Sequence, residues 1–252
     1  MTRDEALFEY LCRLGDNTLV LGHRVSEWCG HSPVLEEDIA LANTALDLIG
    51  QTQLWLGLAG EVEGKGRTAD NLAYLRDAWD FRNVLLVERP NGDFGQTMMR
   101  QFLFDAWQVI NLGRLMTSSD KRVAEIAEKA SKEAAYHIER SGSTVIGLGD
   151  GTEESHQRMQ AALEYHWDYV GEMFVGDEVD TEMVKAGIAP DPASLRVEWD
   201  ELVGRYLKEA TLTVPEAGYV HKGGKTGKHT EHLGYVLSEM QWLQRAYPGA
   251  EW

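Results

Sequence analysis

Residues 3–29 read RDEALFEYLCRLGDNTLVLGHRVSEWC, and this stretch decides the fold class. Its mostly apolar side chains recur every three or four positions, at Leu7, Leu11, Leu14, Thr18, Leu21, Val25 and Trp28. A helix repeats every 3.6 residues, so this spacing places all of them along one side of a helix. The sequence therefore predicts one long amphipathic helix from about Arg3 to Cys29.

The same helical period continues through most of the chain. It predicts further helices over residues 39–60, 69–88, 94–116, 120–145, 152–175, 192–210 and 230–247. Three of the starts carry N-cap signals, at Asp93, at Thr152 and at Asp191 before Pro192. Long helices joined by short loops form bundles. We therefore predict an all-α long-helix bundle, with additional C-terminal helices, as a single domain over residues 1–252.

The connecting segments are marked by glycine, proline and a lack of periodicity. Gly147, Gly149 and Gly151 predict a loop, and residues 176–191 form the longest irregular stretch. Strand-like alternation is suggested by residues 211–214 alone.

Composition excludes several classes of function. The chain has 24 Lys and Arg against 41 Asp and Glu, a formal net charge of −17, so its surface repels nucleic acid. Its first residues lack the apolar core of a signal peptide, and no run reaches the length of a membrane span. Cys12 and Cys29 would lie about 25 Å apart on one helix, too far for a disulfide. We expect a soluble cytoplasmic protein with free thiols.

Bundles of this length often hold a di-iron or di-manganese centre, built from glutamates and two Glu-x-x-His motifs. The one literal Glu-x-x-His, Glu153 to His156, falls in a first helical turn, where acidic residues normally cap. The interior of the predicted helices holds a more informative set of residues. It consists of Glu27, Asp47, Asp105 and Glu133, with Tyr136 and His137 close behind the last.

This set lacks both expected histidines. Gly50 follows Asp47 by three residues and Tyr136 follows Glu133 by three, whereas His137 is rotated by about 100° from Tyr136. The pattern predicts a degenerate metal site. Ordinary ion pairs with Arg24, Arg100 or Arg140 are the main alternative, and a working centre is the remaining one.

Several blocks of the sequence resemble the PaaC family, the C subunits of phenylacetyl-CoA epoxidase. They are LGDN at 14–17, EWCGHSP at 27–33, DIALAN at 38–43, LDLIGQ at 46–51, VERPNGDF at 87–94, KHTEHLG at 228–234 and EMQWLQR at 239–245. The resemblance covers nearly the whole chain. It implies a ferritin-like fold and a non-catalytic structural subunit.

The resemblance also implies partners. The family's members support a homologous catalytic A subunit that carries the di-iron centre, so no cofactor is expected in this chain. A small B subunit bridges the A–C units, and a separate reductase supplies electrons for epoxidation of phenylacetyl-CoA by O₂. The ligand is expected at or near the A–C interface.

Two sets of residues are candidates for contacts with CoA. The resemblance implies contacts at Asp80, Phe81, Arg82 and Asn83 and at Thr181, Glu182 and Met183. The alternative set is Lys222, Lys225 and Lys228 in the most basic segment of the chain, where glycines and a following helix N-terminus suit phosphate. A solvated helix face, or a loop held against a partner subunit, would explain the same residues without a ligand.

Three functions remain open at this point. The chain is either a structural subunit of an oxygenase, a stand-alone ferritin-like di-iron or manganese oxidase, or a ferritin-like binding or storage module. No catalytic residue is assigned, since no Ser-His-Asp or Cys-His signature is present. The missing histidines favour the first function over the second.

Overall fold

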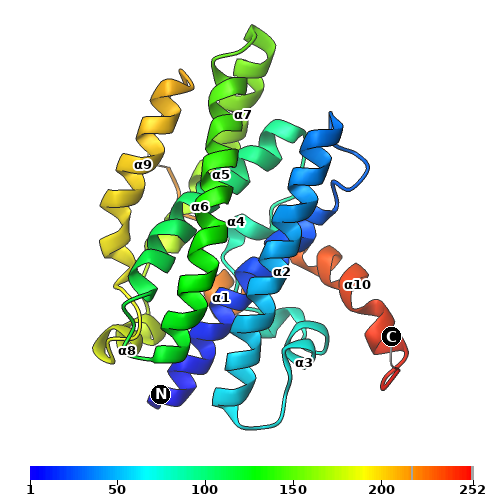
Figure 1. Cartoon of the computed structure of the whole chain (residues 1–252), viewed down its shortest axis with the longest axis vertical. Helices are drawn as coiled ribbons and strands as arrows, with labels where there is room; N and C mark the ends of the chain where they lie inside the picture. Colours follow the sequence, from blue (N-terminus) through cyan, green and yellow to red (C-terminus); the bar gives the residue numbers. More distant parts are fainter. Residues whose placement is uncertain (217, 251–252) are drawn as a thin grey trace. The chain divides into compact units, whose positions relative to one another are not determined.

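The computed structural model describes residues 1–216 and 218–250, and it confirms the predicted all-α class (Figure 1). Within these residues there are ten α-helices, four short 3₁₀ helices and no strand, so the strand suggested at 211–214 is wrong. The α-helices are α1 (Arg3–Ser26), α2 (Leu35–Glu63), α3 (Ala69–Tyr74), α4 (Leu85–Glu88), α5 (Phe94–Leu115), α6 (Lys121–Gly149), α7 (Glu153–Val170), α8 (Glu178–Lys185), α9 (Arg196–Glu209) and α10 (Glu231–Ala246). The 3₁₀ helices are η1 (Ala78–Asp80), η2 (Gly171–Phe174), η3 (Pro192–Leu195) and η4 (Gly224–Thr226).

These helices group into two compact units. The first joins Met1–Pro90 to the C-terminal residues from Lys222 onward, and the second is Asn91–His221. The single domain remains a prediction, and each unit is described by itself. Across the described ranges, no helix is both long enough and apolar enough to cross a membrane.

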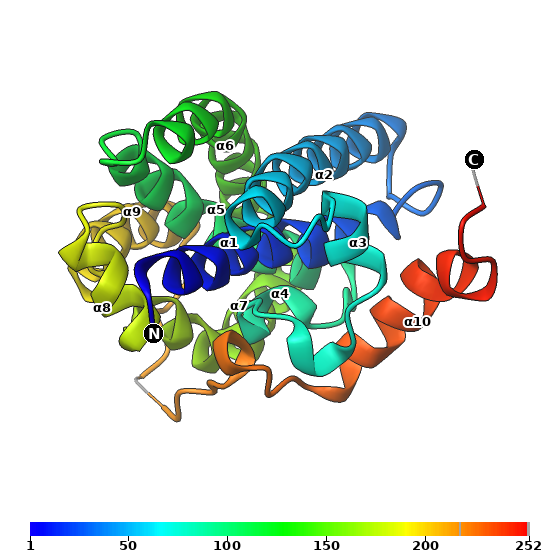
Figure 2. The same cartoon turned by 90° about the horizontal axis from the view of Figure 1, so that it is seen from below.

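The first unit is built on the antiparallel pair α1 and α2, which lie side by side in both views (Figures 1 and 2). Gly15 lies against Leu56, Gly22 lies against Ile49, and the hydroxyls of Thr18 and Thr52 share a 2.8 Å hydrogen bond. A Cβ on Gly15 would come within 2.5 Å of the Leu56 side chain. Glycine at this position therefore lets the two helices approach closely.

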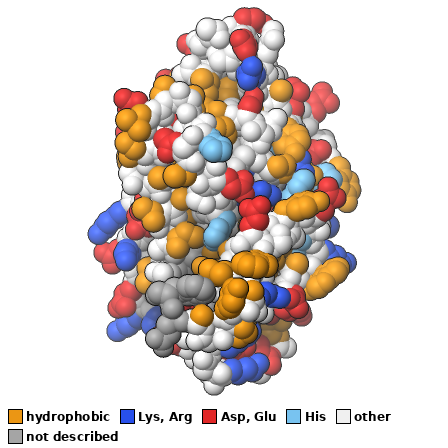
Figure 3. All heavy atoms as spheres, turned by 90° about the vertical axis from the view of Figure 1, so that its right-hand side faces the viewer, with side chains coloured by type: hydrophobic (Ala, Val, Ile, Leu, Met, Phe, Trp, Pro, Cys, Tyr) orange, Lys and Arg blue, Asp and Glu red, His pale blue; other side chains and the backbone are white. Residues whose placement is uncertain are grey.

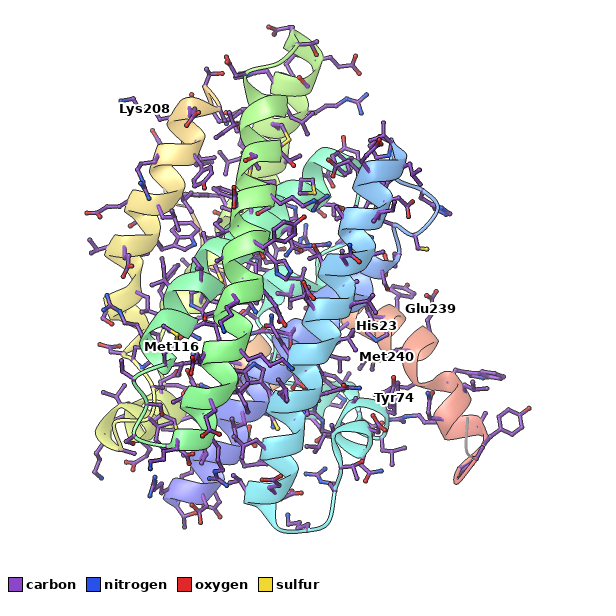
Figure 4. The ribbon with its side chains drawn as sticks, in the orientation of Figure 1. His23, Tyr74, Met116, Lys208, Glu239 and Met240 are labelled. Carbon is purple, nitrogen blue, oxygen red and sulfur yellow. The ribbon has the colours of Figure 1, made fainter. Side chains whose placement is uncertain are left out.

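The C-terminal helix α10 belongs to this same unit. Gln241 Nε2 donates to the backbone carbonyls of Ala73 and Arg76, and Arg245 donates to the carbonyl of Tyr74. Figure 4 shows Tyr74 beside α10, and a surface groove between them is also lined by Tyr247. Figure 3 shows the face that lies on the right-hand side of Figure 1, where hydrophobic side chains are interspersed with charged ones.

The predicted helix over 69–88 is wrong, because this segment breaks into α3, η1 and α4. Two buried polar residues of α1 explain the break. Asp16 accepts from the Arg76 guanidinium and from the backbone N–H of Arg82, and Asn17 accepts from the N–H of Val84. These N–H groups are bound by side chains of α1 instead of helical carbonyls, and the segment bends around them.

The second unit is built on the pair α5 and α6, with α7 and α9 packed on it. Trp199 of α9 is fully buried and donates from Nε1 to the carbonyl of Leu103 at 3.1 Å. The N-caps predicted at Asp93, Thr152 and Asp191 are confirmed, since each side chain accepts a backbone N–H of the following turn.

The loop predicted at Gly147, Gly149 and Gly151 is confirmed only at Gly151, and the irregular stretch predicted at 176–191 is wrong in part. Helix α6 continues through Gly147 to Gly149, where a Cβ would come within 2.5 Å of the Ala210 carbonyl. Gly149 is thus the last residue of α6, and its missing side chain allows close packing against Ala210. Residues 176–191 contain α8, which is capped by Asp177 and buries Val179 and Met183.

Candidate functional site

The first candidate surface, in the first unit, brings the predicted CoA contacts at residues 80–83 together with the three lysines of the alternative set. The loop 222–228, here called the lysine loop, lies directly against residues 79–83. A Cβ on Gly224 would come within 2.1 Å of the Asn83 carbonyl, and one on Gly227 within 2.3 Å of the Trp79 carbonyl. Gly227 also has φ +80°, a conformation that favours glycine. These glycines let the two segments form one surface.

A buried polar pair anchors the lysine loop at its end. His229 Nδ1 lies 3.0 Å from Glu88 Oε2, and His229 Nε2 lies 3.0 Å from the Phe81 carbonyl. The second oxygen of Glu88 accepts the backbone N–H of Thr230 at 2.7 Å. The Glu88 side chain is fully buried, so these hydrogen bonds replace the water that a carboxylate needs.

Only part of the 80–83 set faces solvent. Phe81 and Asn83 are fully buried, whereas Asp80 is exposed. Arg82 donates from Nε to Glu9 at 2.7 Å and from Nη1 to the carbonyls of Trp79 and Phe81. Much of its donor capacity therefore holds the loop together. Lys222 and Lys228 are exposed and Lys225 is half-buried, so the lysine loop presents positive charge to solvent.

The other predicted contacts lie on α8 in the second unit. Thr181 is exposed, Glu182 is half-buried and Met183 is fully buried. The Thr181 hydroxyl donates to the carbonyl of Asp177 at 2.8 Å, so it closes the first turn of the helix.

The residues of the expected degenerate metal site fall in both units. Glu27 and Asp47 belong to the first unit, and Asp105, Glu133, Tyr136 and His137 belong to the second. Glu27 lies at the C-cap of α1, so its predicted place inside that helix is wrong. Its carboxylate pairs with Arg24 at 3.0 Å, which is one of the ion pairs named as the alternative.

In the second unit, Asp105 and His137 are buried neighbours, while Tyr136 is 54% exposed. Asp105 accepts from Gln101 Nε2 at 2.6 Å and from the Ser141 hydroxyl at 2.8 Å. Burial raises the pKa of Asp105 from 3.8 to about 6, and the nearby His137 partly opposes this shift. Glu133 is half-buried on α6.

The part of this set that lies in the second unit does not match the ligand pattern of a di-iron centre. Both carboxylate oxygens of Asp105 already accept hydrogen bonds, and Tyr136 stands where the motif requires histidine. Across residues 1–216 and 218–250, His, Cys, Asp and Glu nowhere gather in a group of three that could hold a metal ion. Glu153 and His156 lie in the first turns of α7, where His156 Nδ1 contacts the Gly149 carbonyl at 2.8 Å.

Comparison with known proteins gives a match along the entire sequence. Residues 1–252 match the family described as phenylacetic acid catabolic protein. The chain belongs to this family. It is 49% identical over 246 residues to the C subunit of 1,2-phenylacetyl-CoA epoxidase from Escherichia coli strain K12. The alignment covers 98% of this chain and 99% of that relative, and it confirms the resemblance seen in the sequence blocks.

Sequence reasoning missed the buried pair that anchors the lysine loop in this member of the phenylacetic acid catabolic family. Glu88 and His229 are 141 residues apart, and both lie inside blocks that carried the resemblance. The signal was a charged residue at the end of an apolar run, Leu85–Glu88, where an unpaired carboxylate would be costly.

Proposed function

We propose that this chain is the non-catalytic structural component of a multicomponent phenylacetyl-CoA epoxidase, equivalent to the C subunit of the Escherichia coli enzyme. The observation that carries the proposal is the 49% identity to that relative over 98% of this chain. In such a complex a homologous A subunit holds the di-iron centre, a small B subunit bridges the A–C units, and a reductase supplies electrons. Phenylacetyl-CoA then binds at or near the A–C interface, and the complex acts in the cytoplasm.

The donor set in the second unit supports a non-catalytic role. A di-iron enzyme leaves carboxylate oxygens and imidazole nitrogens free for its metals. Here the Asp105 carboxylate is bound by Gln101 and Ser141 in the interior of the unit. This polar cluster fills the core in the way that ordinary buried polar groups do. It gives the alternative, a stand-alone di-iron or manganese oxidase, no specific support.

The joined surface of the lysine loop and residues 79–83 supports a contact with CoA in the first unit. Arg82 is held by Glu9 and two carbonyls, so it orders the loop, and the lysines supply charge toward phosphate. The exposed Trp79, at 76% exposure, offers a flat apolar surface beside them. This contact supplements the binding of CoA by the A subunit.

The proposed function is tested by purifying the chain alone and together with the catalytic subunit. The isolated chain should contain substoichiometric iron, and the iron of the complex should follow the catalytic subunit. Each chain should unfold at a higher temperature in the complex, since a partner that binds only the folded state stabilises it. A full di-iron complement in the isolated chain, with an oxo-bridge absorption band, would contradict the proposal.

A further inference from the structure

The side of α2 that faces solvent carries an unusual line of large apolar residues. Leu35, Ile39 and Leu46 are 71%, 54% and 70% exposed. At about 100° per residue, the three lie within roughly 40° of one another around the helix axis. Single exposed apolar residues are normal on a protein surface, whereas an ordered line along one helix indicates a partner.

Two glycines lie on the same side of α2. A Cβ on Gly50 or on Gly57 would meet no atom within 4 Å. By contrast, a Cβ on Gly60 of the same helix would come within 2.1 Å of the Arg67 carbonyl. Glycine inside a helix costs about 1 kcal/mol relative to alanine. Close packing within the chain explains glycine at position 60. Close packing of another helix against this side would explain glycine at positions 50 and 57.

The spacing along this side suits a second helix. Its positions alternate by four and three residues, as in the seam of two packed helices: Ile39, Asn43, Leu46, Gly50, Gln53 and Gly57. Apolar residues at one end of the seam and glycines at the other would let a partner helix come close along its length. We call this set, with Leu35, the α2 seam.

The charged residues of α2 indicate what kind of helix can bind to the α2 seam. Residues 35–63 contain six acidic residues and no Lys or Arg. By the same 100° per residue, Glu36, Asp47 and the exposed Glu61 lie on one flank of the seam, whereas Glu37 lies on the opposite side of the helix. A second copy of α2 would bring acid against acid in either direction, which is destabilising. The complementary partner is a helix with Lys or Arg flanking its apolar face.

We infer that the α2 seam binds an apolar helix flanked by basic residues in the catalytic subunit of the complex. The inference rests on the proposed function and adds the surface and the chemistry of the partner. Contact at the seam would bury Leu35, Ile39 and Leu46 and use the space over Gly50 and Gly57. The negative charge along the flank of the seam would attract the partner's basic residues and repel a second copy of this chain.

The test uses Gly50→Leu, which adds a large side chain over the seam at a position where a Cβ meets no atom of the chain within 4 Å. In the isolated chain this variant should melt at the same or a higher temperature, because leucine favours the helix more than glycine. Its affinity for the purified catalytic subunit should fall by at least about 30-fold, as expected for a central interface position. Leu46→Asp should weaken binding to a similar extent.

The matched control is Gly147→Leu, an exposed glycine in the equally long helix α6 with no atom within 4 Å of its Cβ position. Its affinity should stay within about twofold of the wild type. Binding is measured by calorimetry at low and high salt, and the wild-type complex should weaken as salt rises.

The outcomes separate the inference from the proposed function. If the wild-type chain does not bind the catalytic subunit, both fail. If the wild type binds and Gly50→Leu and Leu46→Asp bind equally well, the α2 seam is not the interface, while the proposed function stands. If the wild-type chain forms a homodimer that Leu46→Asp dissociates, a second copy occupies the seam and the inference is overturned.

Discussion

At the scale of single residues, the chain holds its ionisable groups in dense hydrogen-bond networks. Asp16, Glu88 and Asp105 are each fully buried, and each accepts at least two hydrogen bonds. Asp16 and Glu88 lie within hydrogen-bond distance of a guanidinium or an imidazole, whereas Asp105 accepts from an amide and a hydroxyl, with His137 nearby. Burial raises the pKa of the Asp105 carboxylate.

The first prediction at this scale is that Asp105→Asn stabilises the chain at neutral pH. Burial raises the pKa of Asp105 to about 6, so the folded state binds a proton more tightly than the unfolded state. Stability from this group is then highest below pH 3.8 and is lost as pH rises through about 6. The shift of about two pKa units corresponds to roughly 3 kcal/mol at pH 8, much of which asparagine should restore.

Urea unfolding of the wild type and of Asp105→Asn at pH 5 and pH 8 measures this effect. The advantage of the variant should be larger at pH 8. Ser141→Ala is the control, since it removes one hydrogen bond to the same carboxylate and should destabilise the chain by about 1 kcal/mol or more. A variant that is less stable than the wild type at pH 8 would contradict the explanation by burial.

At the scale of helices, α2 has two different sides. Its inner side packs Leu48, Thr52 and Leu56 against α1, and its outer side carries the α2 seam. Gly57 and Gly60, three residues apart, lie in these different environments. A substitution at Gly57 therefore tests helix propensity alone, whereas the same substitution at Gly60 also tests close packing.

We expect opposite effects from alanine at these two glycines. In the isolated chain, Gly57→Ala should raise the free energy of unfolding by about 0.5–1 kcal/mol, because it meets no atom and favours the helix. Gly60→Ala should lower it by about 1–3 kcal/mol, because its Cβ would overlap the Arg67 carbonyl. Thermal unfolding of both variants under one condition decides the point. Equal effects of the two changes would show that the close approach at Gly60 relaxes freely.

At the scale of the whole molecule, the net charge of −17 makes the lysine loop exceptional. Residues 222–228 carry Lys222, Lys225 and Lys228 without an acidic residue among them. An anionic ligand approaching an acidic protein is attracted only where such local charge outweighs the surrounding field.

We therefore predict that replacing all three loop lysines with alanine weakens CoA binding to the assembled complex by about 1.5–3 kcal/mol, the range of a charged hydrogen bond. Replacing Lys121, Lys129 and Lys132, three exposed lysines of α6, changes the net charge equally and should alter binding by less than about 0.5 kcal/mol. Calorimetry with CoA measures both. If both variants lose the same affinity for CoA, net charge alone explains the effect. If the loop variant loses no affinity, the loop lysines do not contact CoA.

The long helices α1, α2, α5 and α6 and the caps at Asp93, Thr152 and Asp191 could be predicted from local sequence alone. These features depend on neighbours three or four residues away, which the period and the capping residue types reveal directly. Helical geometry also predicted that His137 and Tyr136 point in different directions, and in the structure His137 is buried and Tyr136 is exposed. The family was recognisable from its sequence blocks.

The break in residues 69–88 and the contact of the lysine loop with residues 79–83 arise from contacts between distant parts of the chain. Asp16 and Asn17 draw backbone N–H groups of Arg82 and Val84 away from the helical pattern, across more than 60 positions of sequence. His229 and Glu88 join segments that are 141 residues apart. Burial makes each of these polar contacts obligatory, and burial is a property of the folded chain that local spacing does not contain.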